Sequence, residues 1–576
     1  MSSNVMVNDL PGTSTHSNGV NEFPQNKTIN VRFSIQEIER LYKAGYKKPL
    51  EDVLRAWKCI EEADYLKDPD NSFFILGGYH GEPFAKRADG YYPSDKVYWG
   101  GFCNHGNVLF PTWHRAYLYK LEKAMQNFVP GVALPFFDET CPEALTNGLP
   151  EIFTQDTVEL DGETILNPLK SFTLPEKVHD TGADGTASIQ PPKYNKPKGY
   201  NTVRYPFSGL VNNDKQVELS QKYNDTFTCD QATQLLNKNY AAWMKGINED
   251  PKNDDQGGPS PTDPNPTYNG IFHQYVNCLT APNYTVFSNV TSATPWGKEN
   301  DGYTFALEDP HNDVHLAIGS FSYDGATVGQ EPIVNKKYNI GPNGDMGENN
   351  TAGLDPIFFF HHCNVDRMFW LWQKKNNCTD NLTVIDGYAG TSSSDSQGPT
   401  PDYGFDVKLD MDSPLQPFKS STDPSNYMIS KDVFNIETQL GYTYGPGSLD
   451  LCALASYGEI KTPNVTFTKK MRVYGFSRTK FDGSFVVYAW AVLSTGDKVP
   501  LGARSILSRW NVQQCANCQN HIEVDAIYPL PSKALTDYEA KGKLGCEVKS
   551  RALNPSTGVR ELMSASGEEF QFQVLN

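Results

Sequence analysis

Two groups of histidines, far apart in the chain, constrain most strongly what this sequence can fold into. Only 11 histidines occur in 576 residues, and seven of them lie in these groups: His80, His105 and His114, and then His311, His315, His361 and His362. Neutral imidazole nitrogens bind transition metals when they converge from rigid elements. The sequence therefore predicts two metal ions held side by side, in a fold that brings the two distant segments together.

The local setting of these histidines supports that prediction. Pro111 is well placed for the first turn of a helix that carries His114. His311 and His315 are four residues apart, so a helix projects both rings from one face. Asp366 follows His362 by four residues, where a carboxylate can anchor the helix or orient a ligand. Any one of these histidines alone is more often an ordinary buried or solvated side chain, so the prediction depends on the groups taken together.

The bulk composition limits the classes of partner and compartment. A net charge of −18 and a pI near 5.1 exclude nucleic acid and anionic membranes as favourable partners, since the surface field repels both. The first residues lack a basic segment and an apolar run, which predicts a cytoplasmic protein without a signal peptide. Eleven cysteines at irregular spacing predict free, mostly buried thiols rather than a disulfide framework.

The pattern along the chain predicts two folded parts, because 576 residues exceed what one core usually organises. Helical periodicity is clearest over residues 34–63, and further helices are expected after Pro111, around 311–318 and from Asp355 onward. Short alternating runs from Arg472 onward predict an antiparallel sandwich or barrel. We therefore predict a flexible arm over 1–28, a helical domain over 29–445 and a β-rich domain over 446–576. The Gly445-Pro-Gly-Ser stretch between them is expected to be exposed to proteases.

Two motifs carry a resemblance to a known family. These are His105-Gly-Asn-Val-Leu-Phe-Pro-Thr-Trp-His114-Arg and Asp355-Pro-x-Phe358-x3-His362-x3-Asp366. The chain resembles tyrosinase-type dicopper proteins, most of all the intracellular fungal proenzymes with a C-terminal domain, and the resemblance covers nearly the whole sequence. It implies an α+β multidomain fold: a mainly helical catalytic domain, whose central four-helix bundle holds two coppers, and a C-terminal β-sandwich-like domain.

The resemblance also implies the ligands. Copper A would be bound by His80, His105 and His114, and copper B by His311, His315 and His362. His361 is then the adjacent non-ligand, although the sequence itself does not distinguish it from His362. Cys103 corresponds to the cysteine that forms a thioether with the second copper-A histidine, here His105. Phe358 and Asp366 are expected in the layer around the ligands.

The implied activity is that of a monophenol monooxygenase and o-diphenol oxidase, with dioxygen as co-substrate. It would convert phenols such as L-tyrosine and L-dopa to o-quinones in melanin or other pigment formation. Glu308 and Asn312 are expected to hold a water that removes the phenolic proton. The alternatives are a catechol or o-aminophenol oxidase without monophenolase activity, a dioxygen-binding protein of haemocyanin type, and a zinc-loaded member with altered chemistry.

The C-terminal part is expected to make the enzyme a latent zymogen. Cys515 and Cys518 offer soft thiolates suited to Cu(I) and are expected to assist copper loading, with His521 as a further donor. A side chain shortly before Cys515 would cover the site: Ile506 or Leu507, with Trp510 less favoured. An activating protease is expected as a partner, and a homo-oligomer stays open.

Overall fold

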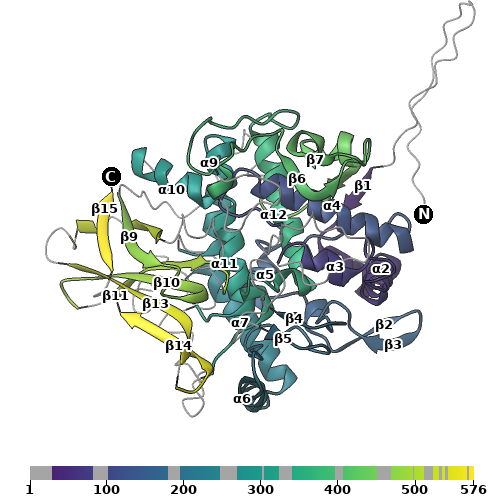
Figure 1. Cartoon of the computed structure of the whole chain (residues 1–576), viewed down its shortest axis with the longest axis horizontal. Coiled ribbons are helices and arrows are strands. Elements are labelled where there is room, and N and C mark those ends of the chain that lie inside the picture. The colour runs from purple at the N-terminus through teal and green to yellow at the C-terminus, as the bar shows by residue number, and fades with distance from the viewer. Residues whose placement is uncertain are drawn as a thin grey trace, which may run out of the picture.

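The computed structural model describes residues 29–81, 102–179, 195–246, 269–300, 304–323, 340–395, 406–450, 469–496, 498–510, 523–530, 535–536, 538, 542–554, 556–566 and 570–575. The predicted arm over 1–28 lies outside these residues, as do Cys515, Cys518 and His521. The helices α1 to α12 all lie before residue 376, and strands occupy the C-terminal part, beside the helical body (Figure 1).

The helices are α1 (Ile35–Lys43), α2 (Lys48–Glu62), α3 (Phe73–Gly78), α4 (Phe110–Phe128), α5 (Pro142–Asn147), α6 (Asp214–Asn224), α7 (Cys229–Lys245), α8 (Ile271–Cys278), α9 (Tyr284–Ser288), α10 (Val290–Glu299), α11 (Glu308–Gly319) and α12 (Ile357–Lys375). The 3-10 turns η3 (Asp345–Gly347) and η4 (Ala352–Leu354) precede α12. Helix α4 packs against α2 and α12, and α11 packs against α7, α8 and α12. The predicted helical centre is therefore confirmed.

The region expected to be one helical stretch, 34–63, is two helices. Ser34 caps the first, because its side chain accepts from the Glu37 amide at 3.1 Å. Gly45, at φ +96°, lies between the helices, and Pro49 lies in the first turn of the second. The periodicity holds in both pieces, since each buries one apolar face, but it could not reveal the turn between them.

The C-terminal strands form two antiparallel sheets, as predicted. Strands β9 (Lys469–Ser477), β12 (Glu523–Leu530) and β15 (Gln571–Leu575) make one, in the order β12-β9-β15. Strands β10 (Asp482–Val492), β11 (Lys498–Ile506), β13 (Lys543–Asn554) and β14 (Val559–Ser566) make the other, in the order β11-β10-β13-β14. Residues such as Phe476, Val487 and Tyr528 form a hydrophobic core of their own. This arrangement is the sandwich that the alternating pattern predicts.

Short strands complete the helical part: β2 (Thr157–Leu160), β3 (Glu163–Leu166), β4 (Val178–His179), β5 (Asn195–Lys196), β6 (Pro414–Lys419) and β7 (Tyr427–Ile429). In addition, β1 (Asn30–Arg32) pairs in parallel with β8 (Tyr442–Tyr444). The pairing brings the first described residues next to the end of the helical part.

The segment after Tyr444 is not the open stretch that its Gly-Pro-Gly composition indicates. The Gly445 amide donates to the Arg32 carbonyl at 2.9 Å, and the Ser448 amide donates to Asp138 at 2.8 Å. The Arg367 guanidinium bonds the Ser448 carbonyl at 2.8 Å and also reaches Asp450. A segment held by main-chain and charged hydrogen bonds is a poor protease substrate, so cleavage within residues 445–450 is disfavoured, and the cleavage site after Tyr444 stays a prediction.

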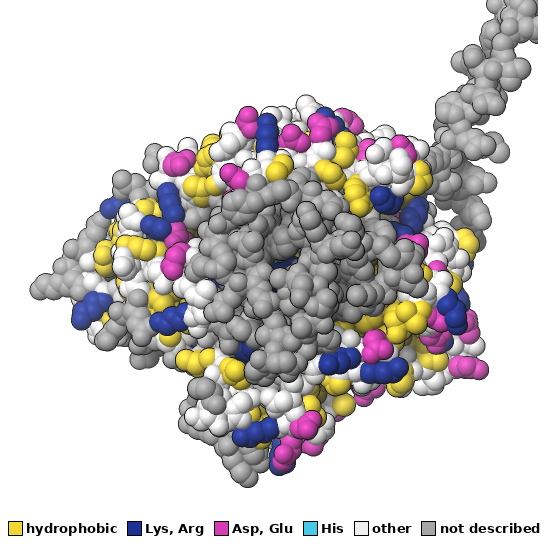
Figure 2. All heavy atoms as spheres, viewed as in Figure 1, with side chains coloured by type: hydrophobic (Ala, Val, Ile, Leu, Met, Phe, Trp, Pro, Cys, Tyr) yellow, Lys and Arg dark blue, Asp and Glu magenta, His cyan; other side chains and the backbone are white. Residues whose placement is uncertain are grey.

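Charged side chains of both signs alternate around the face shown in Figure 2, and none of the described histidines is visible there. Among the described residues, no helix combines the length and the apolar character that crossing a membrane requires.

Candidate dicopper site

The two histidine groups meet at the centre of the helical part. His80 follows α3, His105 precedes α4, and His114 lies in the first turns of α4. His311 and His315 lie on α11, and His362 lies on α12. The His114 and His362 rings stack with centroids 4.6 Å apart, and the His105 and His311 centroids are 5.4 Å apart. The fold thus places side by side two groups that are about 200 residues apart in sequence.

In the second group, three nitrogens point at one another. The Nε2 atoms of His311, His315 and His362 lie 3.1–3.2 Å apart in all three pairs. Three neutral imidazoles cannot satisfy each other in this arrangement, because at least one lone pair must face another. A cation among the three nitrogens removes the conflict, and the distances suit imidazole ligands of one metal ion.

Neighbouring oxygens select the tautomer of several rings. The Nδ1 of His114 lies 2.7 Å from the Phe110 carbonyl oxygen, and the Nδ1 of His315 lies 2.8 Å from that of Met346. The side-chain oxygen of Asn312 lies 3.0 Å from the Nδ1 of His311. An oxygen acceptor favours a proton on Nδ1, which leaves the Nε2 lone pair for a metal.

The first group contains polar atoms that the protein itself does not satisfy. Within the described part of the chain, both ring nitrogens of His80 and of His105 are buried without a hydrogen-bond partner, as is the Nε2 of His114. Ligand atoms of these three residues lie within 4.8 Å of one another. Unpaired buried nitrogens are costly, and a bound metal ion would satisfy them. The residues present therefore fit a second metal ion.

Burial keeps these imidazoles neutral. It lowers the pKa of His114 to about 3, despite the opposing effect of the Phe110 carbonyl. It also lowers the pKa of His80, His105, His311, His315 and His362 well below the ordinary value, and the neighbouring histidines add to the effect. The neutral ring is the form that binds metals, so these histidines can act as ligands at neutral pH.

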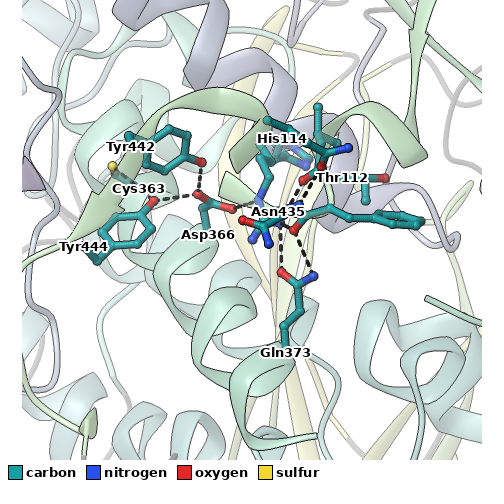
Figure 3. Close-up of polar contacts among 12 residues, drawn as sticks. Thr112, His114, Cys363, Asp366, Gln373, Asn435, Tyr442 and Tyr444 are labelled. Carbon is teal, nitrogen blue, oxygen red and sulfur yellow. Dashed lines mark hydrogen bonds and ion pairs between the residues drawn. The ribbon is translucent and has the colours of Figure 1, made fainter. Parts of the chain in front are cut away.

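Phe358 and Asp366 lie on α12, one turn before and one turn after His362. The Phe358 ring contacts histidines of both groups, with centroid distances of 3.9 Å to His362 and 4.6 Å to His80. The Asp366 carboxylate accepts from the Tyr442 and Tyr444 hydroxyls at 2.7 and 2.6 Å (Figure 3). Asp366 therefore connects the α12 helix to β8 rather than to a histidine ring.

Glu308 and Asn312 lie close to the histidines but have partners of their own. The Glu308 oxygens accept from the Gly106 and Val290 amides, each at 2.9 Å. Burial raises the pKa of Glu308 to about 7. Asn312 bonds His311 as described above and also lines a cavity of about 280 Å³ between α10, α11 and strands β11 and β12.

The cavity is the place where the C-terminal strands approach the site. Ile506 and Leu507 line it together with Asn312 and Gly106. Leu507 and Trp510 are buried and belong to the core of the helical part. Arg509, from the same segment, reaches inward, with its guanidinium 4.0 Å from the Cys103 sulfur.

One contact was missed by sequence reasoning. Glu139 is fully buried and lies 2.5 Å from the Nδ1 of His361. The only signal in the sequence is an acidic pair, Asp138-Glu139, directly after the apolar run 132–137. Nothing in that pattern indicates a partner more than 200 residues away.

Comparison with known proteins agrees with this geometry. A family model described as "Common central domain of tyrosinase" matches residues 70–375. "Tyrosinase HcTyr2" of Hahella sp. (strain CCB-MM4) is 50% identical over 514 residues, which is 87% of this chain and 88% of that protein. A tyrosinase of Aspergillus oryzae is 39% identical over 511 residues, 84% of this chain and 86% of its own.

A solved structure extends the likeness to nearly the whole fold. The tyrosinase from Burkholderia thailandensis at low pH is 45% identical, with a TM-score of 0.77, and the match covers 93% of this chain and 100% of that one. The shared fold includes the helical catalytic domain and the C-terminal strand-rich region. Members of the tyrosinase family carry out oxidation at a dinuclear copper site. This chain belongs to the tyrosinase family and is a tyrosinase-like oxidoreductase.

Proposed function

We propose that the chain is a copper-dependent monophenol monooxygenase and o-diphenol oxidase that converts tyrosine- and dopa-type phenols to o-quinones. The observation that carries the proposal is the convergence of six buried, neutral imidazoles in two facing groups. His80, His105 and His114 would hold copper A, and His311, His315 and His362 would hold copper B. The bound copper pair would supply dioxygen activation and accept the electrons of the phenol.

The protein's own groups would handle the proton. A free phenol has a pKa of about 10, so its ionisation at neutral pH needs a base. Glu308 is suited to that role, because burial raises its pKa to about 7, near the pH of the cell interior. Asn312 lies between the cavity and His311 and would orient both the ring and a water passing the proton.

The proposal is tested by metal analysis and by turnover. We expect two coppers per chain and oxidation of both tyrosine and dopa by the activated enzyme. Oxidation of dopa alone would favour the catechol oxidase alternative, and reversible oxygen binding without turnover would favour the carrier. Zinc in place of copper after growth in copper-replete medium would overturn the proposal.

We further propose that the intact chain is latent, with residues 446–576 as the covering domain. Leu507 lines the cavity beside Asn312 and is packed into the helical core, so it is the better of the two predicted covering residues. Strand β11 also contacts the α11 helix, because the Ser505 amide donates to Asp313 at 2.8 Å. Asp313 lies between the two α11 histidines.

Two further roles complete the proposal: a covalent bond at Cys103, and copper loading by Cys515 and Cys518. Cys103 is buried two residues before His105, a position from which it would form a thioether with that ring. An S–C bond would replace the thiol S–H and a ring C–H, and dioxygen at the copper pair would take up the two electrons and two protons. Mass spectrometry of the peptide would show the loss of two hydrogens, and Cys103→Ala would abolish it.

Cys515 and Cys518 would pass Cu(I) to the site, so replacing both by serine should lower copper content without opening the cover. Normal copper content in that variant would exclude the loading role.

A further inference from the structure

His361 is buried beside the copper-B histidines, and its ligand atom lies within 4.8 Å of theirs, but it is not one of the three whose Nε2 atoms converge. Its ring centroid lies 5.4 Å from that of His311, 5.1 Å from that of His315 and 5.0 Å from that of His362. The first of these pairs is stacked, at an angle of 21°. One imidazole therefore packs against all three rings whose Nε2 atoms point at one another.

The orientation of His361 is fixed from outside the site by a carboxylate. One oxygen of Glu139 lies 2.5 Å from the His361 Nδ1, and the other accepts from the Tyr275 hydroxyl at 2.6 Å. All three side chains are fully buried. Glu139 lies in the turn before α5, and Tyr275 lies on α8, so the carboxylate joins α12 to two other elements.

The contact between Glu139 and His361 bears on the repulsion among the three nitrogens of the copper-B group. Three nitrogens 3.1–3.2 Å apart repel one another before a metal arrives, and each ring gains by turning away. A packed ring that is itself unable to rotate restricts that movement. Groups that hydrogen-bond a metal-binding imidazole are typically worth 10–100-fold in metal affinity or activity, and His361 restricts these rings by packing instead.

We propose that Glu139 is a positioning residue for copper B, acting through His361 to hold His311, His315 and His362 in the converged arrangement. The inference rests on the proposed copper site. It predicts an asymmetry, because the contacts of Glu139 and His361 lie on the copper-B side. Loss of the anchor should weaken copper B and leave the affinity of the other copper unchanged.

The test uses the full chain and reads copper rather than turnover. Glu139→Leu removes both acceptor oxygens, Glu139→Gln keeps hydrogen-bonding groups on the same stem, and His361→Phe keeps a ring that Glu139 cannot hold. Glu39→Gln is the control, since this half-buried carboxylate on α1 accepts from the Ile152 amide and contacts none of the histidines by a hydrogen bond among the described residues. Copper per chain is measured against increasing chelator, together with the EPR spectrum of the oxidised protein and the circular dichroism.

For Glu139→Leu and His361→Phe we expect one copper to be lost at roughly tenfold lower chelator concentration. The other copper should be retained as in the wild type. An EPR signal from an isolated Cu(II) should appear, because the remaining ion has lost the partner to which it was coupled. Glu139→Gln should fall closer to the wild type, and Glu39→Gln should match it.

Loss of both coppers together, or retention of both as in the wild type, would overturn the inference. If Glu139→Leu fails to fold, His361→Phe decides the question by the same criteria. A wild-type chain that binds no copper would instead refute the proposed function, so the two failures are distinguishable.

Discussion

Arg115 and Asp366 form a buried ion pair, with the Arg115 Nε 2.6 Å from an Asp366 oxygen. Arg115 follows His114 on α4, and Asp366 lies one turn after His362 on α12. The pair therefore ties together the two helices that each supply one ligand of a different proposed copper. Its remaining bonds, to Gln373 and to the Val433 and Phe434 carbonyls, leave the guanidinium little freedom.

Replacing Asp366 by asparagine should destabilise the protein strongly. Removing one partner of a buried ion pair leaves the other charge uncompensated and costs roughly 3–5 kcal/mol. The same change removes the charged acceptor of the Tyr442 and Tyr444 hydroxyls. Denaturant unfolding should show the loss, and Glu37→Gln, which breaks an exposed pair with Arg40, should change stability little. Equal effects of the two changes would contradict the structural role of Asp366.

His114→Ala or His362→Ala should each remove one metal ligand and abolish oxidation of diphenols as well as monophenols. Either variant should also contain less copper, because the metal that loses its ligand keeps only two of its three histidines. His273→Ala is the matched control: this histidine belongs to neither group, and burial lowers its pKa to about 4. Substantial dopa oxidation by either ligand variant would show that the ligand set is wrong.

Glu308→Gln should change the pH dependence of stability in a defined window. Burial raises the folded-state pKa of Glu308 to about 7, whereas the ordinary value is about 4.3. Between these values the folded state holds a proton that the unfolded state has released. Wild-type stability therefore falls as pH rises through the window, relative to a variant that cannot titrate.

The free energy of unfolding should shift in favour of the glutamine variant by about 3 kcal/mol between pH of about 4.5 and about 7. A constant offset is expected in addition, because glutamine has one acceptor oxygen for the two amides of Gly106 and Val290. Unfolding curves across this range measure the slope separately from the offset. A difference that does not vary with pH would mean that Glu308 is ionised in the folded chain throughout.

The sequence predicts the helices that carry the histidines better than it predicts their surroundings. Pro111 and the four-residue spacing of His311 and His315 are local signals, and they locate α4 and α11 within a few residues. The motif likewise anticipates Phe358 beside the histidines. The pairing of the two groups, in contrast, depends on tertiary packing, and only their shared chemistry indicates it.

Long-range polar contacts account for what sequence reasoning could not find. Glu139 and His361 are 222 positions apart, and neither flanking sequence has a feature that indicates the other. The segment after Tyr444 misleads for the same reason. Its glycines and proline are typical of an open linker, yet Arg32, Asp138 and Arg367 hold its backbone. Composition reports what a segment can do alone, and buried partners from elsewhere override it.

Removing the cover should activate the intact chain without any cleavage. Leu507 lines the cavity beside Asn312, and its side chain is packed into the helical core. Leu507→Ala leaves an opening where the side chain was, so phenols should reach the histidines and dopa oxidation should rise. Leu553→Ala is the control, because this leucine on β13 is 42% exposed and is not part of the hydrophobic core to which Leu507 belongs. Equal activity of wild type and Leu507→Ala at equal copper content would exclude Leu507 as the covering residue.

Proteolytic activation should cut the connection beyond Asp450. Residues 445–450 are bonded to Arg32, Asp138 and Arg367, so we expect a protease to act between this segment and β9, which begins at Lys469. Limited proteolysis followed by mass spectrometry should therefore give helical-domain fragments that end after residue 450.

The strands should stay associated with the helical part after the cut, because the Ser505 amide bonds Asp313 and Lys298 pairs with Asp525 at 2.6 Å. Activity should then rise only on dissociation, which size-exclusion chromatography and dopa oxidation would follow together. Cleavage directly after Tyr444, or full activity of a clipped chain whose domains remain associated, would contradict this account of the cover.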